Sequence, residues 1–135
     1  MLITRETDYA IRILRVLADK ERHNVSEFCE SDFIPKQFAY KIIKKLSDAG
    51  MISSTRGVNG GCELVTDLKD LNLYDVIKVT DPDNVLSECL KPGNECPWKD
   101  NNKGHCSVHT HLWQIQKVVD EELKKHNLKD MFNLK

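Results

Sequence analysis

The segment from Pro35 to Gly61 constrains the fold more than any other part of the sequence. Pro35 stands where the first residue of a helix is expected, and Gly50 stands just past its end, which is the usual asymmetry of helix termini. Between them an apolar stripe recurs at helical spacing, formed by Ala39, Ile42, Ile43 and Leu46. A β-hairpin is predicted next, over residues 51–65, because glycines able to form a tight turn lie in Arg56-Gly57-Val58-Asn59-Gly60-Gly61.

The helices predicted around this segment are in the order of a winged helix-turn-helix. The first is marked by an apolar stripe formed by Ala10, Ile13, Leu14, Leu17 and Ala18. The predicted spans are 5–20 capped by Thr4, 25–31 capped by Asn24 or Ser26, and a short helix opened by Asn72 and Asp75 that ends near Val79. We therefore predict a mainly α winged helix-turn-helix domain over residues 1–80, with the hairpin as a small β wing.

Positive charge is concentrated in the predicted recognition helix and wing. The whole chain has 20 basic and 21 acidic residues and a net charge of −1. Residues 33–61 nevertheless contain five basic residues and one acidic residue, whereas residues 62–90 contain two basic and seven acidic residues. Local charge decides nucleic-acid binding more than the overall balance does, so this distribution favours a DNA partner.

The polar face of the recognition helix supplies the candidate DNA contacts. We expect Gln37 and Tyr40 to read base edges in the major groove and the lysines to meet phosphates. Arg56 at the wing tip is placed to reach the minor groove. The alternative is an ordinary surface helix with a solvated lysine face, but the joint occurrence of short helix, capped helix, hairpin and local charge favours DNA. The lysines concerned are Lys36, Lys41, Lys44 and Lys45.

Residues 81–105 form an irregular segment that contains cysteines. The segment is rich in proline and glycine and shows little periodicity, and an irregular stretch of this length needs a reason. An odd cysteine count, five in the chain, argues against a disulfide framework. The late cysteines have the pattern Cys89-x6-Cys96-x9-Cys106, followed by Cys106-x2-His109. This spacing is compatible with three alternatives: an iron–sulfur cluster, a zinc ion, or unligated redox-active thiols.

A long helix is predicted after the cysteines, over about 106–126. Its apolar stripe is formed by Val108, Leu112, Ile115 and Val119. The winged helix offers no further core for this stripe, so a helix of a second copy is the favoured partner. The chain is therefore divided into a winged helix at 1–80, an irregular cysteine loop at 81–105, and a dimerisation helix with its tail at 106–135.

Several classes of function are disfavoured. The sequence has no phosphate-binding loop, no nucleophile motif and no paired acid–base carboxylates, so neither an enzyme nor a small-molecule substrate is expected. No apolar run approaches the length of a membrane span, and the first residues lack the apolar stretch of a signal peptide. A cytoplasmic protein with no membrane partner is therefore expected.

Two segments resemble a known family of winged-helix repressors, which includes the iron–sulfur cluster regulator (IscR) and the nitric-oxide-sensing repressor (NsrR). One is the opening Leu2-Ile3-Thr4-Arg5-Glu6-Thr7-Asp8-Tyr9-Ala10-Ile11-Arg12. The other is the wing entry, Lys45-Leu46 through Ala49-Gly50-Met51-Ile52 and then Arg56-Gly57-x-x-Gly60-Gly61. Three late cysteines before a long helix complete the resemblance, which covers essentially the whole chain, although the cysteines are spaced more widely than is common in the family.

The resemblance implies a homodimeric repressor that binds an operator in double-stranded DNA. Cys89, Cys96 and Cys106 would hold one two-iron or four-iron cluster per subunit, and operator binding would respond to iron, redox state or nitric oxide. A cluster-free regulator with zinc or redox-active thiols in the loop is the alternative. Cys29 and Cys62 are expected to pack in the core.

The resemblance leaves two principal candidates for the fourth ligand. Asp8 occupies the place where nitric-oxide-sensing relatives use a carboxylate from the partner subunit, and His109 matches the Cys-x2-His of the cluster regulator. A structural role for Asp8 as a first-turn acid or as a partner of Arg12 is the alternative. Further candidates are His105, His111 and a small exogenous ligand.

Overall fold

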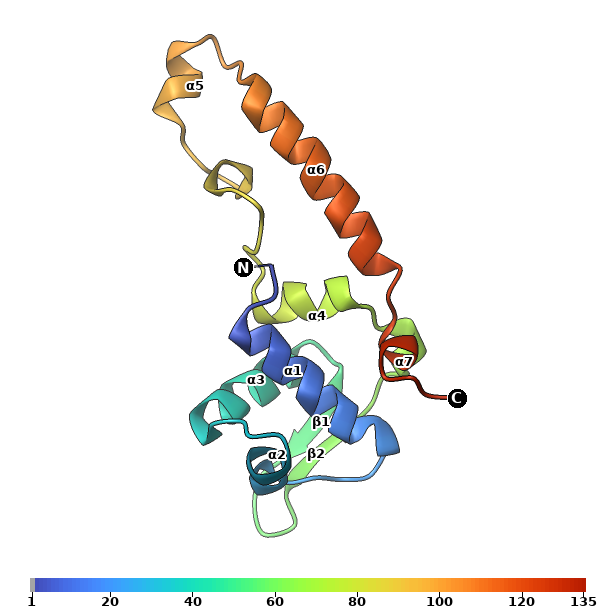
Figure 1. Ribbon diagram of the computed structural model, residues 1–135. Helices are drawn as coiled ribbons and strands as arrows, with labels where there is room; N and C mark the ends of the chain where they lie inside the picture. The colour runs from blue at the N-terminus through green and yellow to red at the C-terminus, as the bar shows by residue number, and fades with distance from the viewer. Residues whose placement is uncertain (1) are drawn as a thin grey trace.

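A bundle of helices with a β-hairpin at its lower end forms the part of the chain that we call the head, residues 2–80 (Figure 1). The structure is a computed structural model and describes residues 2–135. The helices of the head are α1 (Arg5–Val16), α2 (Val25–Ser31), α3 (Lys36–Asp48) and α4 (Leu73–Thr80), with short 3-10 turns η1 (Leu17–Asp19) and η2 (Leu68–Asp70). The hairpin pairs β1 (Ile52–Thr55) with β2 (Gly61–Leu64). The predicted winged helix-turn-helix is confirmed.

The helix boundaries follow from local capping chemistry. Thr4, Asn24 and Asn72 each accept a hydrogen bond from a backbone N–H of the first helical turn, and Asn72 forms a reciprocal capping box with Asp75. The first helix is shorter than the predicted span of 5–20, because the chain tightens into η1 and then takes a left-handed conformation at Lys20. Pro35 is the N-cap of α3 rather than its first helical residue.

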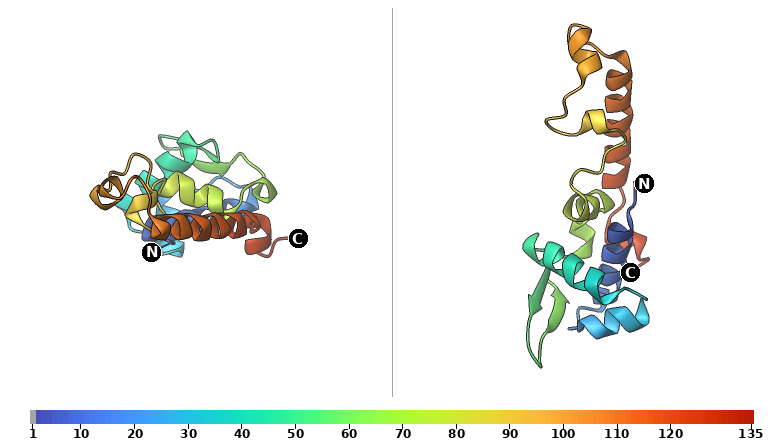
Figure 2. Two further views of the ribbon diagram at one scale, coloured as in Figure 1. Left: turned by 90° about the horizontal axis from the view of Figure 1, so that it is seen from above. Right: turned by 90° about the vertical axis from the view of Figure 1, so that its left-hand side faces the viewer.

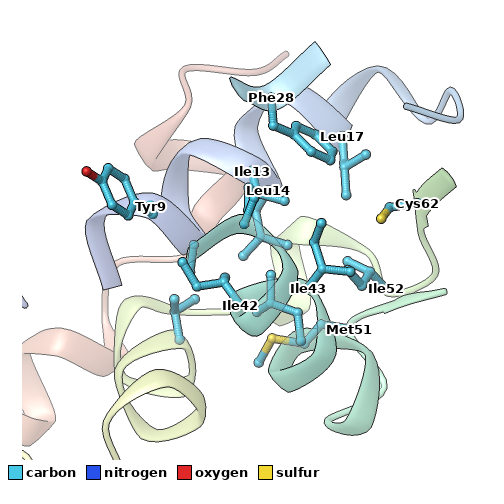
Figure 3. Packing of buried hydrophobic residues seen from close by; sticks show 14 of the residues in the cluster. Tyr9, Ile13, Leu14, Leu17, Phe28, Ile42, Ile43, Met51, Ile52 and Cys62 are labelled. Atoms are coloured by element: carbon cyan, nitrogen blue, oxygen red, sulfur yellow. The ribbon is translucent and has the colours of Figure 1, made fainter. Parts of the chain in front are cut away.

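The core of the head lies where α1, α2 and α3 meet (Figure 3). Ile13, Leu14 and Leu17 of α1 and η1 are fully buried, and so are Ile42 and Leu46 of α3. Phe28 of α2 packs in the same cluster. Cys62 is buried against it and Cys29 is half-buried beside it, so the expected packing positions of these two cysteines are confirmed.

The hairpin is fastened to the head by the loop that precedes α2. The backbone of His23 exchanges two hydrogen bonds with Cys62, with N···O distances of 2.9 and 2.7 Å. Arg22 donates to the Asn59 carbonyl in the turn and to the Glu63 carboxylate in β2. A Cβ at Gly61 would lie 2.8 Å from the His23 carbonyl oxygen, so the close approach of this loop requires glycine there.

The rest of the chain forms an extended arm, residues 81–126. It contains η3 (Glu88–Leu90), α5 (Pro97–Asn101) and α6 (Ser107–Lys124), after which α7 (Leu128–Met131) returns to the head. The wing and α5 lie at opposite ends of the molecule (Figures 1 and 2). The segment 81–105 is less irregular than predicted, because Pro97 starts a short helix at its first position. No helix of residues 2–135 is long and apolar enough to cross a membrane.

Polar contacts hold α6 against the preceding segment of the arm and join the end of α6 to the head. The buried side chain of Gln116 accepts a hydrogen bond from the Leu86 backbone at 2.8 Å and donates to Asp120. At the other end of α6, Asn72 and Asn127 form a backbone bridge. These contacts fix the direction of the α6 axis but leave much of its apolar stripe exposed to solvent.

We expect the stability of the head to depend on the protonation of His23. Burial lowers the pKa of His23, but the hydrogen bonds and charges of Asp19 and Glu27, one on each ring nitrogen, outweigh burial and raise this pKa above its ordinary value of 6.5. A group with a raised pKa stabilises the fold fully below its unfolded pKa, and the stabilisation is lost as the pH rises through the folded pKa.

The unfolding temperature should therefore fall as the pH rises from below 6.5 through the raised pKa of His23. The fall in unfolding temperature should be about 2–4 °C larger for the wild type than for His23→Gln. This difference corresponds to less than about 1 kcal/mol in a domain of this size. Thermal unfolding followed by circular dichroism measures it, with the exposed His111→Gln as the control. Equal pH dependence of the wild type and His23→Gln would contradict the prediction.

Candidate nucleic-acid interface and cysteine segment

The helix α3 presents one polar face to solvent because its opposite face is seated in the core. Ala39, Ile42 and Leu46 are fully buried, and the helical repeat turns the residues between them outward. Tyr40 is more than half exposed. The exposed positions include the sequence-predicted contacts Lys36, Gln37, Tyr40, Lys41 and Lys44.

Two lysines of α3 are held by one carboxylate of α1. Glu6 accepts from the ammonium groups of Lys41 and Lys45, and the Lys45 nitrogen lies 2.8 Å from Glu6 Oε2. Lys45 also donates to the Thr80 carbonyl at 2.9 Å. Burial opposes the ionisation of Glu6, but the bonds and charges of the two lysines hold the pKa of Glu6 below its ordinary value. Lys45 is therefore engaged at the junction of α1, α3 and α4, and its contact with phosphate stays a prediction.

The other predicted DNA contacts differ in how free they are. Lys44 pairs with Asp48 on its own helix at 2.9 Å, and both side chains are well exposed. Within residues 2–135, the side chains of Lys36, Gln37, Tyr40 and Arg56 form no hydrogen bond or ion pair. Arg56 lies in the exposed turn of the wing. The groups available to DNA without breaking a contact are therefore at the start of α3 and at the wing.

The three late cysteines lie at the starts of helical segments in the arm. Cys89 is in η3, Cys96 is the N-cap of α5 and Cys106 is the N-cap of α6, where its sulfur accepts the His109 N–H at 3.4 Å. All three are half-buried free thiols. Among residues 2–135, no three His, Cys, Asp or Glu side chains are grouped so as to hold a metal ion. The isolated chain thus brings the cysteines into one arm but does not gather them at one point.

The two candidates for a fourth ligand lie in different parts of the chain. Asp8 belongs to α1 in the head and accepts from Arg12 at 2.9 Å, with Arg5 at 3.9 Å. Arg12 also donates to the Asp32 carbonyl. His109 is half-buried in the first turn of α6, close to Cys106. The helix α1 belongs to the head, whereas α5 lies at the far end of the arm (Figure 1).

Sequence reasoning missed the residues that orient the interface. The pairing of Glu6 with lysines 35 and 39 residues away in the sequence has no local signal. Arg22, which anchors the wing, likewise contacts residues that are distant in the sequence. A hollow of about 530 Å³ next to Cys106, lined by Trp98, His105 and His111 among others, was equally invisible in the sequence.

A helix-turn-helix with an exposed polar helix and a hairpin wing defines a winged-helix DNA-binding regulator of transcription. The comparison with known families agrees with this class and narrows it. A sequence model of the Rrf2 family, described as "Iron-dependent Transcriptional regulator", matches residues 3–134, so the chain belongs to the Rrf2 family. The expectation of a non-enzymatic regulator is confirmed, since the matched proteins are transcriptional regulators.

One curated protein and two solved structures illustrate what the chain is similar to. The HTH-type transcriptional regulator NsrR of Bacillus subtilis (strain 168) is 29% identical over 141 residues, covering 97% of this chain and 90% of that protein. The crystal structure of Staphylococcus aureus CymR has a TM-score of 0.70 at 18% identity and covers 98% of both chains. T. potens IscR has a TM-score of 0.68 at 21% identity, covering 96% of this chain and 84% of that one. The structural similarities show the shared fold.

Within the described part of the chain, Lys36 is the lysine of α3 whose ammonium group is not paired. Replacing it should therefore weaken DNA binding without disturbing another contact. We expect Lys36→Ala to weaken binding about three- to tenfold, with the slope of log K against log salt reduced by about 1. Fluorescence anisotropy across a salt series measures both quantities. Lys69→Ala, an exposed lysine of η2, is the matched control. An unchanged salt slope in Lys36→Ala would show that this ammonium meets no phosphate.

Proposed function

We propose that this protein is a homodimeric repressor whose binding to an operator responds to an iron–sulfur cluster held by Cys89, Cys96 and Cys106. It would act on DNA in the cytoplasm, with iron, redox state or nitric oxide as the signal. The observation that carries the proposal is the placement of three free, half-buried thiols in one arm, outside the core of the head. The remaining two cysteines pack against that core.

The chemistry of these donors fits an iron–sulfur cluster. Thiolates are the ligands that iron–sulfur clusters require, and short segments joined by flexible turns allow three of them to converge. When bound, such a cluster supplies a centre that is sensitive to oxidants, to nitric oxide and to iron supply. Ligation would also order a segment that has little apolar core of its own, because metal–thiolate bonds contribute directly to folding.

Asp8 and His109 would complete the ligand set in different ways. Because Asp8 lies in the head, it would reach a cluster in the arm from the partner subunit, after exchanging its contact with Arg12. His109 would reach it from the same chain, since it lies in the first turn of α6 beside Cys106. The two candidates therefore make different predictions about whether ligation depends on dimerisation.

The junction around Thr80 connects the cysteine segment with the recognition helix. Thr80 is the last residue of α4, directly before the arm, and its carbonyl accepts from Lys45 of α3. Its hydroxyl, 2.7 Å from that of Thr7 in α1, is buried. A change in the path of the chain at residue 81 would therefore act on α1 and α3 together, and shift the population of head arrangements that fit the operator.

The apolar stripe of α6 is the surface we propose for dimerisation. Val118 is 69% exposed, and Val108 and Ile115 are also more than half exposed. These residues share one side of the helix with the half-buried Leu112 and Val119. Contiguous apolar residues along a long helix are usually covered by a partner helix. The same helix of a second copy offers a matching stripe.

The cysteine assignment is tested by purification without oxygen. We expect a coloured protein containing iron and acid-labile sulfide, and each of Cys89→Ala, Cys96→Ala and Cys106→Ala should lose both, because a missing thiolate removes a ligand. Cys29→Ala is the matched control and should keep them. Stoichiometric zinc without colour or sulfide would support the zinc alternative, and metal-free protein would support the thiol alternative.

The sensing step is tested separately from cluster binding. The apo protein and Cys96→Ala should both bind the operator with an affinity that differs from that of the loaded protein. Electrophoretic mobility shift under anaerobic conditions measures this difference. Equal affinity of the loaded and apo forms would remove the sensing step and leave the DNA-binding function intact.

The dimer is tested by placing a charge on the stripe. Ile115→Glu should convert the dimer to a monomer and weaken operator binding at least tenfold, because a carboxylate buried between two apolar helices is strongly disfavoured. Light scattering after gel filtration gives the mass. Gln114→Glu, an exposed neighbour on the same helix, should remain dimeric. A monomeric wild-type protein would contradict the prediction.

A further inference from the structure

A phenylalanine occupies the turn between α2 and α3 in a conformation that rarely suits it. Phe33 has a φ of 54°, in the left-handed region, and its side chain is 81% exposed. We propose that Phe33 is a DNA-contacting residue whose ring packs against a thymine methyl group at the edge of the major groove. The inference rests on the proposed DNA face of α3 and adds an apolar contact to its polar ones.

The fold itself gains nothing from phenylalanine at this position. Phe33 directly follows Asp32, the C-cap of α2, and the residue after a C-cap is commonly a left-handed glycine or asparagine. A bulky residue is strained in this conformation. The ring does not offset that strain by packing, since it lies almost entirely in solvent. Strain together with an exposed aromatic ring indicates a function outside the fold.

The turn that carries Phe33 is held rigidly on both sides. The Asp32 N–H donates to the Phe28 carbonyl at 3.1 Å, and Arg12 donates to the Asp32 carbonyl at 3.0 Å. On the other side Ile34 is buried, with 2% of its surface exposed. The ring is therefore presented from a fixed backbone, which lowers the entropic cost of using it in recognition.

The position of Phe33 places it at the end of α3 that approaches bases. It lies three residues before Lys36, the first residue of the helix, so at most about 10 Å of backbone separates their Cα atoms. In helix-turn-helix proteins the first residues of the recognition helix contact base edges. Lys36 and Gln37 are free in that region, and an apolar group beside them matches the methyl group that distinguishes thymine in the major groove.

The decisive variant is Phe33→Gly, because the proposal predicts opposite effects on stability and on binding. Glycine relieves the left-handed strain, so the unfolding temperature should rise by about 2–5 °C. Affinity should fall about five- to tenfold, since the apolar contact is lost. The probe is a duplex selected from a random pool by the full-length wild-type protein. The salt slope should stay at the wild-type value, because the ring contacts no phosphate.

Further variants separate this inference from the proposed DNA face. Phe33→Leu keeps an apolar side chain and should retain most of the affinity, whereas Phe33→Asn, which tolerates the conformation, should bind as weakly as Phe33→Gly. Met131→Ala on α7, away from α3 (Figure 1), is the matched control. Repeating the selection with Phe33→Gly should abolish a thymine preference in each half-site.

Three outcomes would overturn the inference. Wild-type affinity in Phe33→Gly, with Lys36→Ala still weakened, would show that the DNA face is correct but Phe33 is not part of it. Wild-type affinity in both would show that α3 does not bind DNA through this end. Loss of stability together with affinity in Phe33→Gly would show that Phe33 supports the fold instead.

Discussion

The orientation of α3 depends on the apolar contact between its buried stripe and α1. Ile42 and Leu46 are fully buried in the same cluster as Ile13 and Leu14, and each such side chain contributes about 1.5–3 kcal/mol. The Glu6 ion pairs are partly exposed, and a surface pair contributes about 0–1 kcal/mol. The apolar contact therefore decides which face of α3 is outward, and Glu6 adjusts the position of a helix that is already seated.

Ion pairs reduce the number of cations in residues 33–61 that are free to contact DNA. Residues 33–61 contain five basic side chains, yet Lys41 and Lys45 are engaged by Glu6, and Lys44 is paired with Asp48. The unpaired cations are concentrated at Lys36 and Arg56, one at the start of α3 and one on the wing. A protein with few free cations has weak non-specific attraction to DNA. In the proposed dimer, affinity would then depend more on base contacts and on the simultaneous fit of two heads.

The features predictable from the sequence are those with a local signal. Helical periodicity identified the buried faces of α1 and α3, capping side chains identified the starts of three helices, and the glycines identified the hairpin. What the sequence did not contain is the pairing of distant groups, such as Glu6 with Lys45 or Arg22 with the wing, because many alternative partners have the same local pattern. The cysteines show the same limit. Their spacing marked one segment, but convergence at one point depends on the path of residues 81–106, which no period specifies.

The head and the arm are stabilised in different ways, and this difference connects the two halves of the proposed function. The head has a continuous core that buries residues of α1, α2, α3 and α4, together with Leu128 of α7. Cys89, Cys96 and Cys106 lie outside that core, and α6 leaves an apolar stripe exposed. A second copy of the chain or a ligand of the thiols would therefore order the arm, which has less core of its own than the head. Because the arm begins directly after Thr80, whose carbonyl accepts a hydrogen bond from Lys45, that change would reach α3 at the lysine that is held by two contacts.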